Sequence, residues 1–260
     1  MSKSALQIPQ TLRCGSLRNK KGESVESGVH LIALMSRALN LPNLGSSNVL
    51  DIGCGGTFTQ ALLDRQLPLK RYVGVDVHRE MVEFLRMNVD DPRFCYQHMN
   101  VHNAIHNPDG EPLHEGTELP LGEETFDIIS LFSVLTHLAP HDYVTMLKIL
   151  RRYVKPNGRL FIELFVNELT TGGHGHADKM ARAFARTDAS KMDEHRAKFE
   201  AAMQQQRVPN FVDVYPDEPL RVAMYSREYA LSLVENTGWA VESLNDPEDY
   251  IQHYMICRPV

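Results

Sequence analysis

Strand-like and helix-like segments alternate along the middle of the chain, and this alternation restricts the fold more than any other feature. Short apolar runs, rich in residues that favour strands, occur at 48–52, 71–76, 93–98, 126–133 and 159–166. Helical spacing of apolar residues separates them, at about 57–66, 79–89 and 140–154. A later helix at about 226–237 and strands near 239–244 and 250–257 continue the pattern. Such alternation predicts an α/β protein with a parallel sheet covered by helices on both faces.

Two segments lie outside this alternation. Residues 1–45 are expected to form an N-terminal helical segment, because apolar residues recur at intervals of three or four over about 24–40. Residues 167–222 contain a Gly/His loop and a charged helical stretch at about 177–205, and we expect them to form a lid inserted after the fifth strand. The length of 260 residues is compatible with a single domain that carries both additions.

Composition excludes several classes of protein. Hydrophobic residues make up 43% and charged residues 23%, as in globular proteins, so the composition does not indicate disorder. The net charge of -6 argues against a nucleic-acid partner, because phosphate binding needs a cationic surface. No run of 18 apolar residues and no apolar N-terminal leader is present, so we expect a cytoplasmic protein without membrane contact. The four cysteines form no C-x-x-C pair, which predicts reduced thiols.

A glycine-rich turn follows the first strand. The strand ends at Asp51 and Ile52, Gly53-Cys54-Gly55 form the turn, and helical spacing follows. Because glycine has no Cβ, a ligand can approach the backbone amides of such a turn closely. The second strand ends in Asp76, 25 residues after Asp51, where a carboxylate can accept hydrogen bonds from both hydroxyls of a ribose. Together these features predict a cofactor that contains a nucleoside.

The same turn weighs against a dinucleotide. The G-x-G-x-x-G pattern of NAD sites would place a third glycine where this chain has Phe58. Asp51 would stand beside a pyrophosphate, which is unfavourable, whereas it would stand well beside an ammonium group. A nicotinamide-dependent oxidoreductase remains the alternative from another enzyme class, and a non-catalytic cofactor-binding protein is a second alternative.

Four ordered motifs resemble those of class I S-adenosylmethionine-dependent methyltransferases. They are Asp51-Ile52-Gly53-Cys54-Gly55, Gly74-Val75-Asp76, Phe126-Asp127-Ile128-Ile129-Ser130 and Val154-Lys155-Pro156-Asn157-Gly158. The resemblance covers about residues 45–166 well and residues 226–257 more loosely. It implies a Rossmann-like, doubly wound sheet of seven strands in the order 3-2-1-4-5-7-6, with the last strand antiparallel.

The resemblance also implies S-adenosylmethionine as the cofactor. The turn from Asp51 to Gly55 would lie under the methionine portion, Asp76 would hold the ribose, and Asn100 and Val101 would lie beside the adenine. Asn100 stands where the family usually has an acid, and its amide oxygen can accept the same hydrogen bond. The complete expected set of cofactor-binding residues is Asp51, Gly53, Cys54, Gly55, Asp76, Val77, Met81, Asn100, Val101, Phe132 and Ser133.

The residues after the fourth strand are expected to face the reacting methyl group, because ligands of open α/β sheets bind at the carboxyl ends of the strands. His137 is the catalytic candidate, as a base that removes a proton from a hydroxyl; the alternative is a histidine that caps a helix or bonds a carbonyl. Thr136, His174 and His176 are the expected substrate-binding residues. Glu163 and Glu168 lie on or just beyond the fifth strand, and the simplest interpretation of each is an ordinary polar strand end.

Metal binding is not expected. His98, His102 and His106 recur every four residues, but a strand end and Asn107-Pro108 interrupt any helix that would align them. We therefore predict methyl transfer from S-adenosylmethionine to a small molecule by in-line displacement, with a hydroxyl oxygen as acceptor and nitrogen as the alternative atom.

Overall fold

A computed structural model of the chain describes residues 6–13, 23–167, 169–170, 174–175, 193–194, 196–198, 201, 210–215, 217–247 and 252–260. Of the helical stretch predicted at 177–205, only residues 193–194, 196–198 and 201 are described, and these are helical. The rest of that prediction lies outside the described residues.

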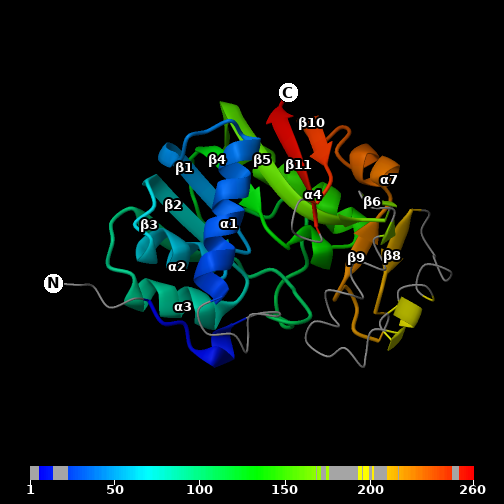
Figure 1. Ribbon diagram of the computed structural model, residues 1–260, viewed down its shortest axis with the longest axis horizontal. Coiled ribbons are helices and arrows are strands. Elements are labelled where there is room, and N and C mark those ends of the chain that lie inside the picture. The colour runs from blue at the N-terminus through cyan, green and yellow to red at the C-terminus, as the bar shows by residue number, and fades with distance from the viewer. Residues whose placement is uncertain are drawn as a thin grey trace. The chain divides into compact units, whose positions relative to one another are not determined.

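Nine strands of the described residues form one sheet, seven of them in the hydrogen-bonded order β10-β11-β5-β4-β1-β2-β3 (Figure 1). The predicted order 3-2-1-4-5-7-6 is confirmed, with β10 and β11 as the sixth and seventh strands. The bounds are β1 Leu44–Ile52, β2 Leu69–Asp76, β3 Phe94–His98, β4 Phe126–Leu131, β5 Val154–Val166, β10 Trp239–Asn245 and β11 His253–Pro259. β11 runs antiparallel to β10, which agrees with an antiparallel last strand.

The described residues divide between two compact units. The first unit comprises Met1–Pro112, Thr117–Leu131 and Tyr153–Leu160. The second unit comprises Leu113–Gly116, Phe132–Arg152 and Phe161–Val260.

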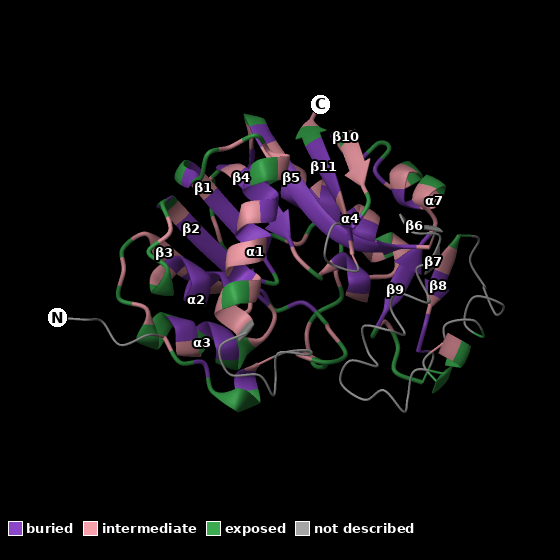
Figure 2. Cartoon of the chain, viewed as in Figure 1, coloured by how far each residue is buried: buried purple, intermediate pink, exposed green. Residues whose placement is uncertain are grey.

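In the first unit, β1 lies between β2 and β4 and pairs with both in parallel. The last four residues of β1, from Val49 to Ile52, are all buried, as the apolar run predicts for a strand covered on both faces (Figure 2). The unit also contains the helices α1 (Glu23–Ala38), α2 (Thr57–Asp64) and α3 (Arg79–Asn88). A Cβ on Gly28 of α1 would lie 2.6 Å from the carbonyl oxygen of Thr57, so glycine allows α1 to pack closely on α2.

The fourth and fifth strands have other bounds than predicted. β4 ends at Leu131 rather than at residue 133, because Ser133 has a φ of 58° and cannot continue a strand. β5 begins at Val154 rather than at 159 and runs through Pro156. Lys155 anchors this early part of the strand, since its Nζ donates to both carboxylate oxygens of Asp127 on β4 at 2.9 Å.

The second unit contains α4 (Pro140–Leu150) and α7 (Arg227–Ser232), the short turn η3 (Leu135–His137) and four short strands. The strands are β6 (Leu169–Thr170), β7 (His174–Gly175), β8 (Phe211–Asp213) and β9 (Ala223–Tyr225). β9 pairs in parallel with the end of β5 and antiparallel with β8, and neither β8 nor β9 was expected from the sequence. The segment after the fifth strand therefore returns to the sheet before α7 begins.

Candidate functional site

The glycine turn after β1 is fastened to the end of β2. The backbone N–H groups of Gly53 and Cys54 both donate to the carbonyl oxygen of Val75, at 2.8 and 3.3 Å. Gly53 and Gly55 have φ values of 66° and 44°, which favour glycine. Among the described residues, no atom would lie within 4 Å of a Cβ on Gly55. One side of the turn is thus open to a ligand, as the sequence led us to expect.

Asp76 links this turn to the next helix. Its Oδ2 accepts the N–H of Gly55 and its Oδ1 accepts the N–H of His78, both at 2.8 Å. The residue is 8% exposed. Because a carboxylate has about four sites that accept hydrogen bonds, two sites remain for a pair of ligand hydroxyls. The carboxylate therefore fits the ribose-binding role predicted for it.

Two further predicted cofactor residues lie next to the turn. The carbonyl oxygen of Val77 is 3.1 Å from Nε2 of His98, which ties the loop after β2 to β3. Met81 is buried in α3, and its sulfur would lie 3.6 Å from a Cβ on Gly56. Both residues shape the surroundings of the turn.

Asp51 is buried in the sheet just before the turn. Its Oδ2 accepts the hydroxyl of Tyr72 at 2.6 Å, and its Oδ1 accepts the hydroxyl of Ser130 at 2.7 Å. Burial raises the pKa of this carboxyl to about 7, with a smaller upward contribution from the charge of Asp76, while the two hydrogen bonds act in the opposite direction. Asp51 is therefore close to its titration point at neutral pH.

Cys54 has a packing role in the turn. Its side chain is buried, and a Cβ on Gly74 would lie 2.7 Å from its sulfur. Burial raises the pKa of the thiol well above its usual value. The thiol therefore stays protonated and fills space beside β2.

The residues expected beside the adenine lie in a loop after β3 that is held by hydrogen bonds between its own residues. The side-chain amide of Asn107 donates to the amide oxygen of Asn100 at 3.2 Å, and the N–H of Val101 donates to the carbonyl oxygen of Met99 at 2.9 Å. The ring of His106 stacks on that of His78 with centroids 5.1 Å apart. Asn100 keeps one site on its oxygen that can accept from a ligand.

The three spaced histidines have separate partners. His98 lies against the carbonyl oxygen of Val77, Nδ1 of His102 lies 2.9 Å from the carbonyl oxygen of Pro108, and His106 stacks as described. Among the residues that the structure describes, no group of three or more metal-ligating side chains occurs.

Four predicted residues follow β4 in the second unit. Phe132 stacks on Phe161 with centroids 5.1 Å apart, and Ser133 Oγ accepts from the side-chain amide of Gln252 at 2.8 Å. Thr136 is buried, and its hydroxyl donates to the carbonyl oxygen of Ser133 at 2.9 Å. Thr136 thus holds the turn after β4 in shape.

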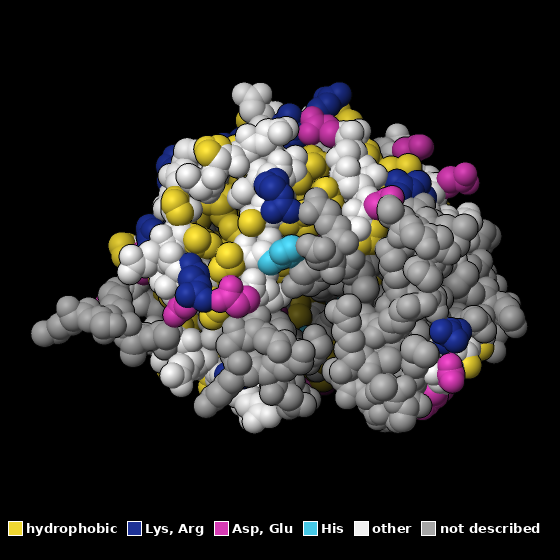
Figure 3. Space-filling view, viewed as in Figure 1, with side chains coloured by type: hydrophobic (Ala, Val, Ile, Leu, Met, Phe, Trp, Pro, Cys, Tyr) yellow, Lys and Arg dark blue, Asp and Glu magenta, His cyan; other side chains and the backbone are white. Residues whose placement is uncertain are grey.

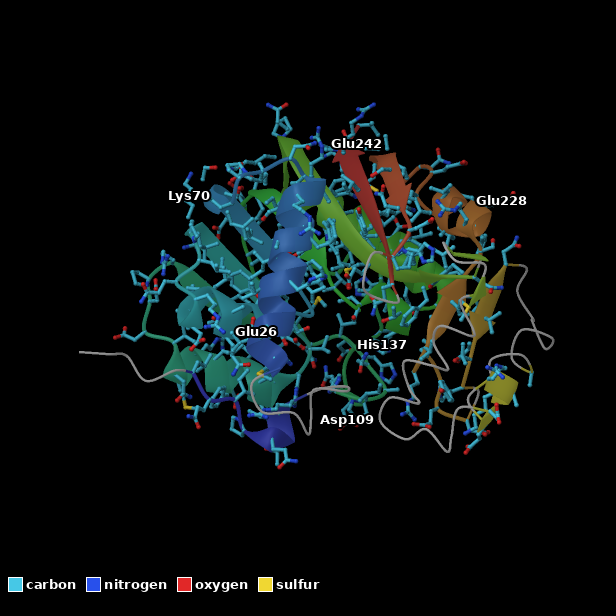
Figure 4. The ribbon with its side chains drawn as sticks, in the orientation of Figure 1. Glu26, Lys70, Asp109, His137, Glu228 and Glu242 are labelled. Carbon is cyan, nitrogen blue, oxygen red and sulfur yellow. The ribbon has the colours of Figure 1, made fainter. Side chains whose placement is uncertain are left out.

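His137 ends the turn η3 (Figure 4). Its Nδ1 lies 3.1 Å from the carbonyl oxygen of Leu220, which belongs to the connection between β8 and β9. Burial lowers the pKa of the ring, although bonds to the backbone of Leu220 and Arg221 act upwards. A neutral ring that donates through Nδ1 carries its lone pair on Nε2. The carbonyl bond expected as the alternative role is present, and it leaves Nε2 in the form that a base needs.

Glu163 differs from its prediction. It lies in the interior of β5 and not at its end, and it is 2% exposed. Burial raises its pKa to about 8, and its buried Oε1 has no hydrogen-bond partner among the described residues. The run Leu160–Val166 contains Glu163 as its one charged residue. An acid within such an apolar run is a signal of a buried carboxyl that sequence reasoning could have used.

The remaining predicted substrate residues are described only in part. His174 lies in β7, which pairs antiparallel with β6, but its side chain is outside the described residues. His176 is outside them as well.

No helix in the described ranges has the length and apolar character that crossing a membrane requires. On the face shown in Figure 3, Lys and Arg side chains of the described residues are interspersed with Asp and Glu.

Fold and turn together define the class of protein: a Rossmann-like class I methyltransferase fold. Residues 50–162 match the family model described as "Methyltransferase domain". Residues 50–162 therefore resemble a methyltransferase domain, and S-adenosylmethionine is the cofactor that this domain and fold imply.

Solved structures with the same fold include three that illustrate its range. The mitomycin 7-O-methyltransferase MmcR has a TM-score of 0.56 and 16% identity, over 94% of this chain and 56% of that one. CalO1, a methyltransferase in calicheamicin biosynthesis solved in its SAH-bound form, has a TM-score of 0.54 and 17% identity, over 92% of this chain and 55% of that one. The PH0226 protein from Pyrococcus horikoshii OT3 has a TM-score of 0.56 and 15% identity, over 98% and 100% of the two chains. The chain thus spans little more than half the length of the first two proteins.

Proposed function

We propose that this protein transfers the methyl group of S-adenosylmethionine to a hydroxyl oxygen of a small molecule in the cytoplasm. The methyltransferase domain match supports the reaction class. Two of the similar structures are named as methyltransferases that act on mitomycin or in calicheamicin biosynthesis, which favours a small acceptor. The net charge of -6 disfavours a nucleic acid as acceptor.

The cofactor would be held by the first unit. Asp76 would accept the ribose hydroxyls, Asn100 and Val101 would contact the adenine, and the turn from Gly53 to Gly55 would lie along the methionine portion. The open side of Gly55 supports this placement, because nothing in the described structure fills the space that its missing Cβ would face. When bound, the cofactor supplies an electrophilic methyl group on a positively charged sulfur.

The hydrogen bond of His137 is the observation that carries the choice of a hydroxyl acceptor. Nδ1–H donates to the carbonyl oxygen of Leu220, so Nε2 can accept the proton of an acceptor hydroxyl. In the reaction the acceptor oxygen forms a bond to the methyl carbon while the bond from that carbon to sulfur breaks. The electron pair of that bond stays on sulfur, and the hydroxyl proton ends on Nε2. Holding the acceptor oxygen in line with the bond from the methyl carbon to sulfur supplies most of the rate acceleration, and removal of the hydroxyl proton adds to it.

The 167–222 segment is proposed as a lid over the acceptor within one domain of residues 1–260, with His174 and His176 among its contacts. Replacing residues 174–205 by a short Gly/Ser linker would then abolish methyl transfer while S-adenosylhomocysteine still binds. Full activity after this deletion would refute the lid, and loss of S-adenosylhomocysteine binding by a folded variant would place the segment in the cofactor site.

Turnover with labelled cofactor tests the function. The protein is incubated with S-adenosylmethionine labelled in its methyl group and a panel of phenols, alcohols and amines, and labelled products are separated by chromatography. We expect transfer to a hydroxyl compound, and we expect His137→Gln to lower kcat about 100-fold without changing affinity for S-adenosylhomocysteine. Product from amines only would contradict the choice of acceptor. Binding of NAD, with no binding of S-adenosylmethionine or S-adenosylhomocysteine, would favour an oxidoreductase instead.

A further inference from the structure

Three neighbouring strands contribute side chains to one buried polar cluster. Asp51 on β1 accepts from Tyr72 on β2 and from Ser130 on β4, one hydroxyl to each carboxylate oxygen. Ser130 is the residue directly opposite Asp51 in the pairing of β1 with β4. Because paired residues of adjacent strands point to the same face, the sheet itself sets this arrangement.

The second donor, Tyr72, lies on β2 but is not directly opposite Asp51. Tyr72 is opposite Val49, and Gly74 is opposite Asp51. Tyr72 lies two residues before Gly74 and hence on the same face of the sheet. Glycine at position 74 leaves no side chain opposite the carboxylate, so the Tyr72 hydroxyl is the group of β2 that contacts it.

The cluster contains the Asp51 carboxylate but, among the described residues, no cationic group that would neutralise it. The groups that act on the Asp51 pKa in the described part of the chain are Tyr72, Ser130 and Asp76, and none of them is a cation. The buried Cys54 thiol lies nearby and is held in its neutral form. An ionised carboxylate that is buried without a positive partner is costly, and a cationic group of a ligand would offset this cost.

We propose that Tyr72 and Ser130 are positioning residues for the amino group of the cofactor, because they aim the Asp51 carboxylate and favour its ionised form until a ligand ammonium completes the cluster. This inference rests on the proposed function. It assigns a role to two hydroxyl side chains that belong to no glycine motif and need not touch the cofactor.

The proposal predicts binding that depends on pH. Below about pH 7 the free protein holds Asp51 protonated, so a ligand ammonium must first displace that proton. Affinity for an amino-acid ligand should therefore fall up to tenfold for each pH unit below 7 and level off above it. The facing groups are the Asp76 carboxylate, the Cys54 thiol and the hydroxyls of Tyr72 and Ser130. The two hydroxyls lower the Asp51 pKa, so removing either one should move the midpoint to higher pH.

Calorimetric titration with S-adenosylhomocysteine between pH 5.5 and 8 tests this proposal. We expect Tyr72→Phe and Ser130→Ala each to weaken binding roughly tenfold at pH 7 and to shift the pH midpoint upwards. Tyr96→Phe is the matched control, because the Tyr96 hydroxyl is also buried in the sheet but pairs with Thr59 Oγ1 at 2.9 Å. Its pH profile should equal that of the unchanged protein.

A second ligand separates positioning from general damage. 5′-Methylthioadenosine has the adenine and ribose but lacks the amino-acid portion with its ammonium group, so its affinity should be independent of pH in this range and equal in all four proteins. If Tyr72→Phe and Ser130→Ala leave the pH profile for S-adenosylhomocysteine unchanged, or weaken both ligands equally, the positioning role is overturned. If the unchanged protein binds neither ligand, the proposed function itself fails.

Discussion

Replacement of Glu163 by glutamine should stabilise the protein, and increasingly so as the pH rises. Glu163 lies in the interior of β5, its Oε1 has no hydrogen-bond partner in the described part of the chain, and burial raises its pKa from 4.5 to about 8. A raised pKa means that the folded protein keeps this carboxyl protonated while the unfolded chain ionises it above pH 4.5. Stability is thus lost as the pH rises from about 4.5 to about 8.

The size of the effect follows from this interval. One pKa unit corresponds to about 1.4 kcal/mol, so the cost of keeping Glu163 neutral is near zero below pH 4.5, roughly 3 kcal/mol at pH 7 and approaches about 5 kcal/mol above pH 8. Glutamine has nearly the same shape and no charge to suppress. The free energy of unfolding of Glu163→Gln should therefore exceed that of the unchanged protein by an amount that grows over this range.

Urea unfolding followed by circular dichroism at pH 5, 7 and 9 measures the difference. Glu242→Gln is the control, because Glu242 is an exposed carboxylate on β10 (Figure 4). Its curve should run parallel to that of the unchanged protein. A stability difference for Glu163→Gln that stays constant from pH 5 to pH 9 would refute the reasoning, because it would mean that Glu163 titrates alike in the folded and unfolded chains.

Two further predictions concern the glycine turn and β2. Asp76→Ala removes both oxygens proposed to accept from the ribose, so affinity for S-adenosylhomocysteine should fall at least tenfold in calorimetry; an unchanged Kd in a folded variant would place the ribose elsewhere. Gly74→Ala adds a Cβ 2.7 Å from the sulfur of Cys54 and should cost about 1 to 3 kcal/mol in chemical unfolding. Cys54→Ala combined with Gly74→Ala should recover part of that loss, and strictly additive losses would contradict the contact.

The parallel strands of the sheet could be predicted from the sequence, because the apolar runs and the residues that end them are neighbours in the sequence. β1 and β2 end in buried runs, β3 has a buried residue at its centre, and a glycine or polar residue marks the end of each strand, so their carboxyl ends were placed correctly. β8 and β9 were not predicted, since three-residue strands have too few residues to show a periodic pattern.

Features that depend on long-range contacts could not be predicted in the same way. The partners of Asp51 come from strands that are distant in the sequence, and the bond from His137 to Leu220 joins residues 83 positions apart. No local pattern indicates which carbonyl a histidine will meet. The motifs can therefore indicate candidate residues for the chemistry, whereas the protonation of those residues depends on neighbours that only the fold brings together.

The central place of β1 in the sheet has a consequence for synthesis of the chain on the ribosome. β1 can pair with β2 early, but its other neighbour, β4, follows about 79 residues later, as the contact between Asp51 and Ser130 shows. The ribosome adds about 5 to 20 residues per second, so the edge of β1 that pairs with β4 stays unpaired for roughly 4 to 16 s. During this interval the apolar residues Val49 and Leu50 are flanked by unpaired backbone groups, which favours intermolecular strand pairing. Nascent chains that stop before Leu131 should therefore aggregate, and they would need a chaperone until β4 has been made.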